Sequence, residues 1–239
     1  MRSEVRYGGL EELTTCEISD ALIKLGIMTG GHIPDMNMYS PLDESTKVIG
    51  PAFTVKMVVW DDKDPPKPED HFVDASPPGS IIIISAPFIR RAACWGGLMS
   101  TAAKARGVKG VIVQGGCRDL NEHRQIGFPV FAHYHSTLGQ KTFVRPSQLN
   151  VPIRMDMIQQ SSYPDPRAEG SSSIDGGGTV VEPGDIIVAD LDGCVAIPRA
   201  SVTDVVRVGM ELKGVDERVR EDLESGIAVK ETMAKWRGS

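Results

Sequence analysis

The chain lacks a long apolar run, and this absence excludes several classes of protein. Of its 239 residues, 41% are hydrophobic, yet no segment approaches the ~20 apolar residues of a membrane-spanning helix. The longest candidate, IIIISAPF at 81–88, has only the length of a strand and contains a proline. The stretch MRSEVRYGGL at 1–10 has no apolar signal-peptide core. We therefore expect no membrane segment and, by default, a cytoplasmic location.

Clustered positive charge and paired cysteines are also missing. The formal net charge is −6 and no group of Lys or Arg opposes it, which argues against nucleic acid as a partner. We expect reduced thiols in an intracellular protein, with a disulfide or a zinc site as the less favoured alternative. No CxxC pair occurs, since the four cysteines are scattered: Cys16, Cys94, Cys117 and Cys194.

Three common enzyme signatures are absent as well. The chain contains no GxSxG nucleophile elbow, no P-loop and no GxGxxG dinucleotide fingerprint. The GGG at 176–178 lacks a strand before it and a helix after it, so we interpret it as a turn. Chemistry assisted by a metal ion remains open.

Buried strands and helices alternate in the middle of the chain. Continuous apolar runs predict strands at 80–86, 108–116 and 128–134, with a helix at 98–106 between the first two. This order predicts parallel strands joined by a right-handed crossover. A further stretch at 48–60 predicts either a strand pair or one long strand.

The segments around this centre have a different character. Residues 9–26 predict a helix interrupted near Thr14, with Ser19 and Asp20 as a possible cap of its second half. That pair fits a catalytic role less well. The charged, proline-rich segment 61–70 predicts an exposed loop, and strand-forming sequence resumes directly after it.

The last third predicts a flexible insertion, short strands and a helix within one domain spanning 1–239. The low-complexity segment 161–178 is expected to form a surface loop. Residues 179–198 predict short strands joined by PGD and LDG turns. The segment 199–239 predicts an amphipathic helical tail, interrupted at Gly214.

The most informative pattern is the spacing of one glycine and three charged residues. Twenty residues separate Gly97 from Arg118 and Asp119, and Glu122 follows shortly after. Arg118 and Asp119 then lie at the carboxyl end of a strand, beside the amino end of the helix that begins near Leu98. Such a site suits a small anion held next to a metal ion.

Each group in this pattern has a chemical role to offer. Asp119 is the expected direct ligand of Mg²⁺ or Mn²⁺, and Glu122 an outer-shell or water-held helper. The planar fork of Arg118 matches a carboxylate bidentately. An anion cradle is completed by three backbone N–H groups: Leu98, Met99 and Ser100. The alternative is a loop ion pair between Arg118 and Asp119.

The histidines carry less information. His123 follows Glu122 and is able to reach the same site. His133 and His135 alternate on a strand and share one face, but no third zinc ligand is evident. Polar lining or surface is the favoured interpretation of that pair. The remaining two occupy loops and suggest nothing specific: His32 and His71.

These stretches resemble the RraA-like family, which includes the 4-hydroxy-4-methyl-2-oxoglutarate aldolases. The G-x20-R-D-x2-E/D spacing is specific, and the similarity covers most of the chain. The matching segments are TTCEISDALIKLG (14–26), IGPAFTVK (49–56), PPGSIIIIS (77–85), WGGLMSTAAKARGVKGVIVQGGCRDLNEHR (95–124), FPVFAH (128–133) and PGDIIVADLDGCVAIP (183–198).

The resemblance implies an architecture and a set of residue roles. The implied fold is a single α/β domain of the swivelling β/β/α type, similar to a phosphohistidine domain, with a C-terminal helix. Homotrimers or homohexamers with active sites between subunits are implied. Asp119 would coordinate the divalent metal, Arg118 would hold the pyruvoyl group, and the backbone after Gly97 would bind its carboxylate.

One residue departs from the family pattern. Many members carry Asp where this chain has Gly97, and the WGGLMST version is similar to a fungal-type branch. Because Gly97 has no carboxylate, proton transfer at that point has to pass to water, to Glu122 or to a neighbouring subunit.

The activity implied is that of a class II, metal-dependent pyruvate aldolase. Such an enzyme cleaves 2-oxo acids of the 4-hydroxy-4-methyl-2-oxoglutarate type and decarboxylates oxaloacetate, through a pyruvate enolate stabilised by the metal and Arg118. The alternative is a non-catalytic regulatory protein, because some relatives inhibit an RNA-degrading enzyme by contact. A methyltransferase is least favoured, since no glycine-rich adenosylmethionine loop is present.

Overall fold

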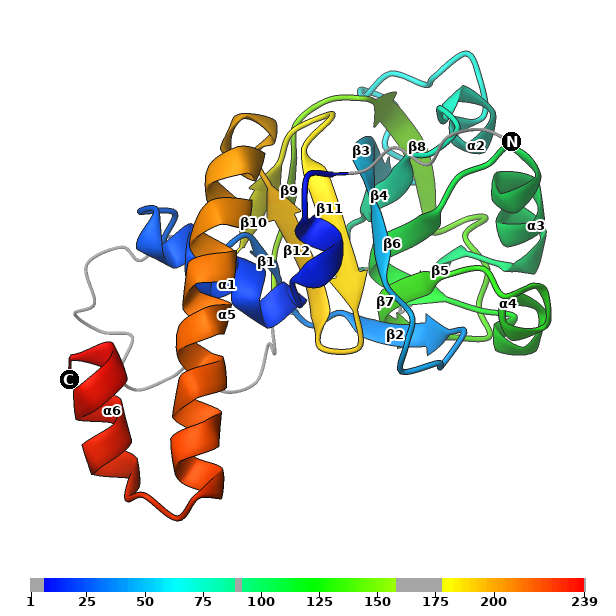
Figure 1. Ribbon diagram of the computed structural model, residues 1–239. Helices are drawn as coiled ribbons and strands as arrows, with labels where there is room; N and C mark the ends of the chain where they lie inside the picture. The colour runs from blue at the N-terminus through cyan, green and yellow to red at the C-terminus, as the bar shows by residue number, and fades with distance from the viewer. Residues whose placement is uncertain (1–6, 89–91, 158–177, 239) are drawn as a thin grey trace, which may run out of the picture.

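A mixed β-sheet runs through the protein, with helices on both sides of it (Figure 1). This computed structural model describes residues 7–88, 92–157 and 178–238. The helical elements are η1 (Leu10–Glu12), α1 (Thr15–Lys24), α2 (Phe72–Ala75), α3 (Gly97–Ala105), α4 (Leu120–Ile126), η2 (Arg199–Ser201), α5 (Val202–Glu224) and α6 (Val229–Arg237).

The strands range in length from 2 residues in β1 to 12 residues in β3. They are β1 (His32–Ile33), β2 (Asn37–Ser40), β3 (Val48–Val59), β4 (Ile81–Ser85), β5 (Ala93–Trp95), β6 (Gly110–Cys117), β7 (Val130–His135), β8 (Val144–Leu149), β9 (Ile153–Met155), β10 (Thr179–Val181), β11 (Ile186–Asp190) and β12 (Gly193–Ile197).

The centre of the sheet is parallel, as the sequence predicts. Strands β3, β4, β6 and β7 are neighbours in that order, and each adjacent pair runs parallel. The segment 48–60 forms one long strand, β3, which settles the choice left open by the sequence. Antiparallel strands β11, β12 and β1 extend the sheet on one side, and β2 pairs with β7 at the other end.

Side chains of the central strands alternate between two cores, because successive residues of a strand point to opposite faces. Ile82 and Ile84 pack in the core that includes Phe72, Trp95 and Ala103, from α2, β5 and α3. Ile81 and Ile83 point to the opposite face of β4 and pack with the β9–β10 pair and with β11. The predicted β/β/α layering is confirmed, and it leaves the ends of β5 and β6 next to α3 and α4.

A third core joins the amino-terminal and carboxyl-terminal helices to the sheet. Leu22 of α1 and Val205 of α5 pack against Val188 and Val195 of β11 and β12. The predicted short strands of 179–198 are present as β10, β11 and β12. Segment 61–70 forms a mostly exposed loop, also as predicted. Apart from Gly178, the predicted 161–178 insertion lies outside the described residues.

The predicted cap of α1 is wrong. Thr14 caps this helix, since its hydroxyl accepts from the Glu17 N–H at 3.2 Å while the Glu17 carboxylate accepts from the Thr14 N–H at 2.8 Å. Ser19 and Asp20 lie inside the helix, and the Ser19 hydroxyl donates to the Gly30 carbonyl instead.

The predicted break at Gly214 is wrong as well. Helix α5 continues through Gly214, because packing of a long helix outweighs the ~1 kcal/mol that a glycine costs. The chain reverses at Gly226, whose left-handed φ of 87° suits glycine. Helix α6 then returns along α5 (Figure 1), and the Trp236 indole N–H donates to the Asp222 carboxylate at 2.7 Å. No described helix is long and apolar enough to cross a membrane.

The third core supplies a direct test of the packing. Leu22 is fully buried, whereas its neighbour Ile23 is 45% exposed. Leu22→Ala should lower the free energy of unfolding by about 2–5 kcal/mol, because it leaves a cavity between α1 and the sheet. Ile23→Ala is the matched control and should cost about 1 kcal/mol or less. Equal losses in urea unfolding of the two variants would contradict this packing.

Candidate active site

Asp119 stands at the turn where β6 gives way to α4. It is the N-cap of α4 and has a left-handed φ of 64°, which Asp tolerates better than most residues. The Arg118 N–H donates to the Trp95 carbonyl at 3.0 Å, which ties this turn to β5. A residue held in a sparsely populated conformation is common where a site requires a fixed geometry.

Helix α3 begins beside this turn, as the spacing predicts. The Gly97 N–H donates to Oδ2 of Asp119 at 3.0 Å, so the first turn of α3 meets the carboxylate directly. The positive end of the helix dipole favours an anion at this point. The sequence-based prediction that these two segments meet is therefore confirmed by an atomic contact.

The predicted backbone cradle is narrower than the sequence suggests. The N–H groups of Met99 and Ser100 both donate to the Gly96 carbonyl, at 3.0 and 3.2 Å, because α3 already begins at Gly97. Among the described residues, no hydrogen bond engages the N–H of Leu98. That group is the one free donor left from the three that the sequence predicts.

Arg118 lies along the side of this opening. Its Nε is 3.4 Å from Oδ2 of Asp119, and about half of its side chain is exposed. A Cβ on Gly139 would lie 2.8 Å from Nη1 of Arg118, so this glycine allows the guanidinium to lie against the backbone. Within the described part of the chain, the two terminal nitrogens of Arg118 make no hydrogen bond, and they are available to a carboxylate ligand.

Glu122 fills the space beside Gly97. A Cβ built on Gly97 would lie 1.8 Å from Oε2 of Glu122 and 2.6 Å from its Cδ. A Cβ on Gly96 would lie 2.7 Å from Oδ2 of Asp119. The two glycines therefore leave room for two carboxylates. Glu122 occupies the place where a side chain at position 97 would project.

These groups line a single cavity of about 520 Å³. The lining brings together the predicted residues Leu98, Met99, Arg118, Asp119 and Glu122. It also contains residues that the sequence did not single out: His71, Ala93, Cys94, Trp95, Gly96 and Gln140. Two carboxylates, a guanidinium and a helix amino terminus thus face one opening.

A chain of buried hydrogen bonds connects the elements that carry the site. Ser100 is fully buried, and its hydroxyl accepts from the Trp95 indole N–H at 2.7 Å and lies 2.9 Å from Nδ1 of His123. The sequence predicted a backbone role for Ser100 and placed His123 within reach of ligand. Instead, His123 is fully buried, and burial lowers the pKa of its imidazole below the ordinary value. Both residues connect α3 to α4.

The other histidines divide between core, surface and site. His133 is buried, which lowers the pKa of its imidazole, whereas His135 is exposed and contacts the Tyr39 ring edge-on. His32 begins β1. His71 caps α2, with Nδ1 accepting from the Val73 N–H at 3.3 Å. No signal in the sequence marks His71 as a lining residue, because the loop before it has no periodicity.

The donor set fits magnesium better than zinc. Among the described residues, no group of three or more His, Cys, Asp or Glu side chains is arranged to hold a metal ion. Asp119 and Glu122 nevertheless place two carboxylates around Gly97. Mg²⁺ accepts one or two carboxylates and keeps several waters, so this oxygen-only set is compatible with it. All four cysteines are free, and burial raises the pKa of the Cys94 and Cys117 thiols to about 12.

With this geometry in place, the chain can be assigned to a family. It belongs to the RraA-like family, since the sequence model of that family, described as Aldolase/RraA, matches residues 15–196. The match includes every residue of the candidate site and ends at the last strand of the sheet.

Two curated relatives are similar to different extents. A protein of Halalkalibacterium halodurans named "Putative 4-hydroxy-4-methyl-2-oxoglutarate aldolase" is 30% identical over 208 residues, which cover 87% of this chain and 82% of that protein. Protein DlpA of Legionella pneumophila is 26% identical over 231 residues. That alignment covers 95% of this chain but only 33% of DlpA, so the chain spans about a third of that relative.

Solved structures share the architecture. An uncharacterized protein from Pseudomonas syringae superposes with a TM-score of 0.72 at 26% identity, over 94% of both chains. RraAS2 from Streptomyces coelicolor, an unusual member of the RNase ES inhibitor RraA protein family, has a TM-score of 0.70 at 21% identity. It covers 89% of this chain and 95% of that one, and the likeness shows the fold alone.

The contact between Gly97 and Glu122 predicts a pairwise coupling. Gly97→Ala should lower the free energy of unfolding by about 1–3 kcal/mol, because the new methyl group overlaps the Glu122 side chain. Adding Glu122→Ala should remove the part of that cost that comes from the Cδ and Oε2 overlaps, whereas the Cβ at position 122, 2.9 Å from the added methyl group, should keep the rest. Urea unfolding of the two single variants and the double variant gives the coupling energy. Additive effects would show that the two positions do not share this space.

Proposed function

We propose that the protein is a divalent-metal-dependent lyase that releases pyruvate from small 2-oxo acids. The observation that carries this proposal is the junction at Gly97, where the Asp119 and Glu122 carboxylates meet the start of α3 beside the free fork of Arg118. The curated aldolase relative supports the same class of reaction. Cleavage of 4-hydroxy-4-methyl-2-oxoglutarate and decarboxylation of oxaloacetate are the two reactions proposed.

Asp119 and Glu122 are the residues that would hold Mg²⁺ or Mn²⁺ here. Asp119 would be the direct ligand, and Glu122 would help from the outer shell. When bound, the metal supplies Lewis-acid polarisation of the substrate's C2 carbonyl. The Gly97 N–H fixes the orientation of the Asp119 carboxylate by hydrogen bonding to one of its oxygens.

The remaining groups bind and orient the substrate. Arg118 pairs with the 2-oxo acid carboxylate through its terminal nitrogens, and the Leu98 N–H donates to the same anion at the helix start. When the bond between C3 and C4 breaks, negative charge develops on the C2 oxygen, and the Arg118 guanidinium lies beside it. Lysine plays no part in this chemistry.

Glu122 is the proposed proton acceptor. Retro-aldol cleavage requires loss of the C4 hydroxyl proton, and the family position that often supplies a carboxylate is Gly97 in this chain. The Glu122 side chain occupies that place, so it takes the proton directly or through one water. Oxaloacetate loses carbon dioxide at the same bond and needs no base there, so one site serves both substrates.

The family resemblance supports a proposal for the assembly and an alternative function. We propose a homotrimer or homohexamer with active sites between subunits, in the cytoplasm. A regulatory protein that acts by contact is the second candidate. The presence of Arg118, Asp119 and Glu122 in one cavity favours the enzyme, because contact inhibition has no need of that arrangement.

Asp119→Asn tests the proposal most simply. Asn tolerates the left-handed backbone at this position, so the variant should fold normally. After the metal-only rate is subtracted, magnesium-dependent pyruvate release from oxaloacetate should be about 100-fold or more slower than in the wild type. The reason is that a neutral amide is a poor ligand for Mg²⁺. Asp204→Asn is the matched control, because Asp204 forms an ion pair with Arg207 on α5. Unchanged turnover in Asp119→Asn at saturating magnesium would refute the assignment.

A further inference from the structure

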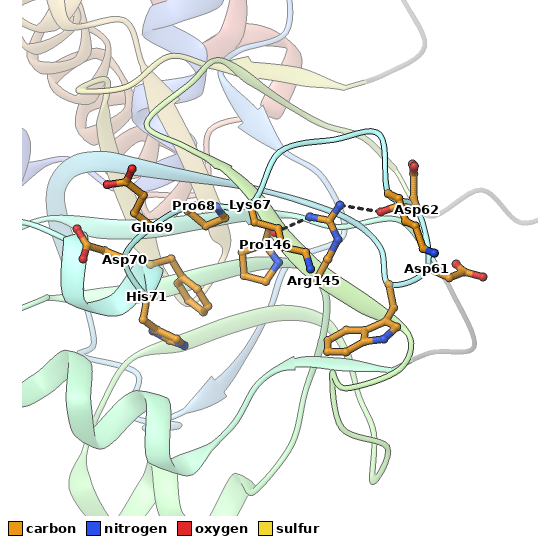
Figure 2. Close-up of a pocket in the computed structure, with 12 residues that line it drawn as sticks. Asp61, Asp62, Lys67, Pro68, Glu69, Asp70, His71, Arg145 and Pro146 are labelled. Carbon is orange, nitrogen blue, oxygen red and sulfur yellow. Dashed lines mark hydrogen bonds between the residues drawn. The ribbon is translucent and has the colours of Figure 1, made fainter.

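A second cavity, of about 710 Å³, adjoins the candidate active site. It lies between the 61–71 loop and the start of β8 (Figure 2). In this view, His71 and Asp70 lie at one end of the row of lining side chains, and Asp61 and Asp62 lie at the other. None of the reaction steps described above uses this cavity.

Arg145 holds the wall of this cavity in place. It is only 5% exposed, and its terminal nitrogens donate to the carbonyls of Asp62, Pro65 and Pro66 at 2.7–2.8 Å. Within the described residues it forms no ion pair with a carboxylate. Because three backbone carbonyls are fixed to one buried guanidinium, the proline-rich loop has a defined shape despite its exposed side chains.

The two cavities are neighbours, since His71 lines both of them. The His71 ring stacks on Phe72 with a centroid distance of 4.5 Å. Phe72 in turn lies 6.1 Å from the ring of Trp95, which lines the candidate active site. His71 therefore marks the side on which a substituent of a substrate held by Arg118 would meet the second cavity.

The chemistry of the second cavity favours one kind of substituent. Its lining includes the flat rings of Trp60 and His71, which suit aromatic contacts, and two prolines, Pro68 and Pro146; Phe72 lies buried behind them. Its charged lining offers no net positive charge to hold an anion, because the carboxylates outnumber the cations: Asp61, Asp62, Glu69 and Asp70 against Lys63, Lys67 and Arg145. Arg145 contributes the third positive charge, but carbonyls already engage its terminal nitrogens, so it offers no free fork to a carboxylate.

We propose that this cavity receives an uncharged aromatic group carried on C4 of the substrate, with Trp60 and His71 as the specificity-determining residues. The inference rests on the proposed lyase function and names its substrate class: 4-hydroxy-2-oxo acids with an aryl group on C4. The C3–C4 bond breaks, its electron pair remains on the pyruvate fragment, and the C4 hydroxyl becomes an aldehyde carbonyl. The hydroxyl proton is balanced by the proton that C3 gains in pyruvate.

Three substrates test the preference. Pyruvate release is measured from 4-hydroxy-2-oxo-4-phenylbutanoate, from 4-hydroxy-2-oxopentanoate and from 4-hydroxy-4-methyl-2-oxoglutarate, with oxaloacetate as the reference for the shared enolate chemistry. The kcat/KM for the phenyl compound should exceed those of the other two aldols by about tenfold or more. An equal or lower value for the phenyl compound would overturn the proposal.

Two variants assign the effect to the cavity. Trp60→Ala and His71→Asn should each lower the ratio of kcat/KM for the phenyl compound to that for oxaloacetate by about tenfold. Asn at position 71 keeps an acceptor for the α2 cap, so this variant removes the ring and not the cap. Met28→Ala is the control, because Met28 is 78% exposed and lines neither cavity. An unaltered ratio in both cavity variants would overturn the assignment.

A binding measurement separates this inference from the proposed function. Calorimetry compares 2-oxo-4-phenylbutanoate, which has no C4 hydroxyl to lose, with pyruvate. The phenyl compound should bind about tenfold more tightly to the wild-type protein, and Trp60→Ala should abolish that advantage. This outcome would support the aromatic site even if oxaloacetate were not turned over and the lyase proposal failed. Equal binding of the two acids would overturn the inference whatever the catalytic result.

Discussion

The hydrogen bond between the Gly97 N–H and the Asp119 carboxylate fixes the geometry on which the rest of the site depends. It connects the first turn of α3 with the cap of α4 at an N···O distance of 3.0 Å. These helices follow the adjacent parallel strands β5 and β6, so the sheet brings both helix starts to one edge. The buried chain from Trp95 through Ser100 to His123 holds the same two helices together beneath the surface.

Space at the two glycines explains how the site keeps a second carboxylate. Gly96 leaves room for Asp119, and Gly97 leaves room for Glu122. Both carboxylates of this site therefore come from the start of α4, and the first turn of α3 supplies the space between them. His71 lines both this site and the cavity that contains Trp60, and this shared residue is the basis for the proposed aromatic substrate.

Much of the fold was predictable because the central strands are continuous apolar runs. Ile81–Ser85 and Gly110–Cys117 carry this signal, and their order along the chain places Asp119 next to α3. Details that depend on tertiary contacts were not predictable. The predicted helix break at Gly214 was wrong because packing of α5 overrides the low helix propensity of glycine. The position of His71 depends on a loop whose shape is set by Arg145, which is distant in sequence.

The most direct test of the account is a titration of the wild-type protein with Mn²⁺, in which the electron paramagnetic resonance signal of the free ion is followed. Oxalate, which resembles the pyruvate enolate, is added in a parallel series. The account predicts that each chain binds one ion, that oxalate tightens this binding, and that Asp119→Asn loses it. Absence of Mn²⁺ binding to the wild-type protein, or equal binding by Asp119→Asn, would contradict the assignment of this site to a metal-dependent lyase.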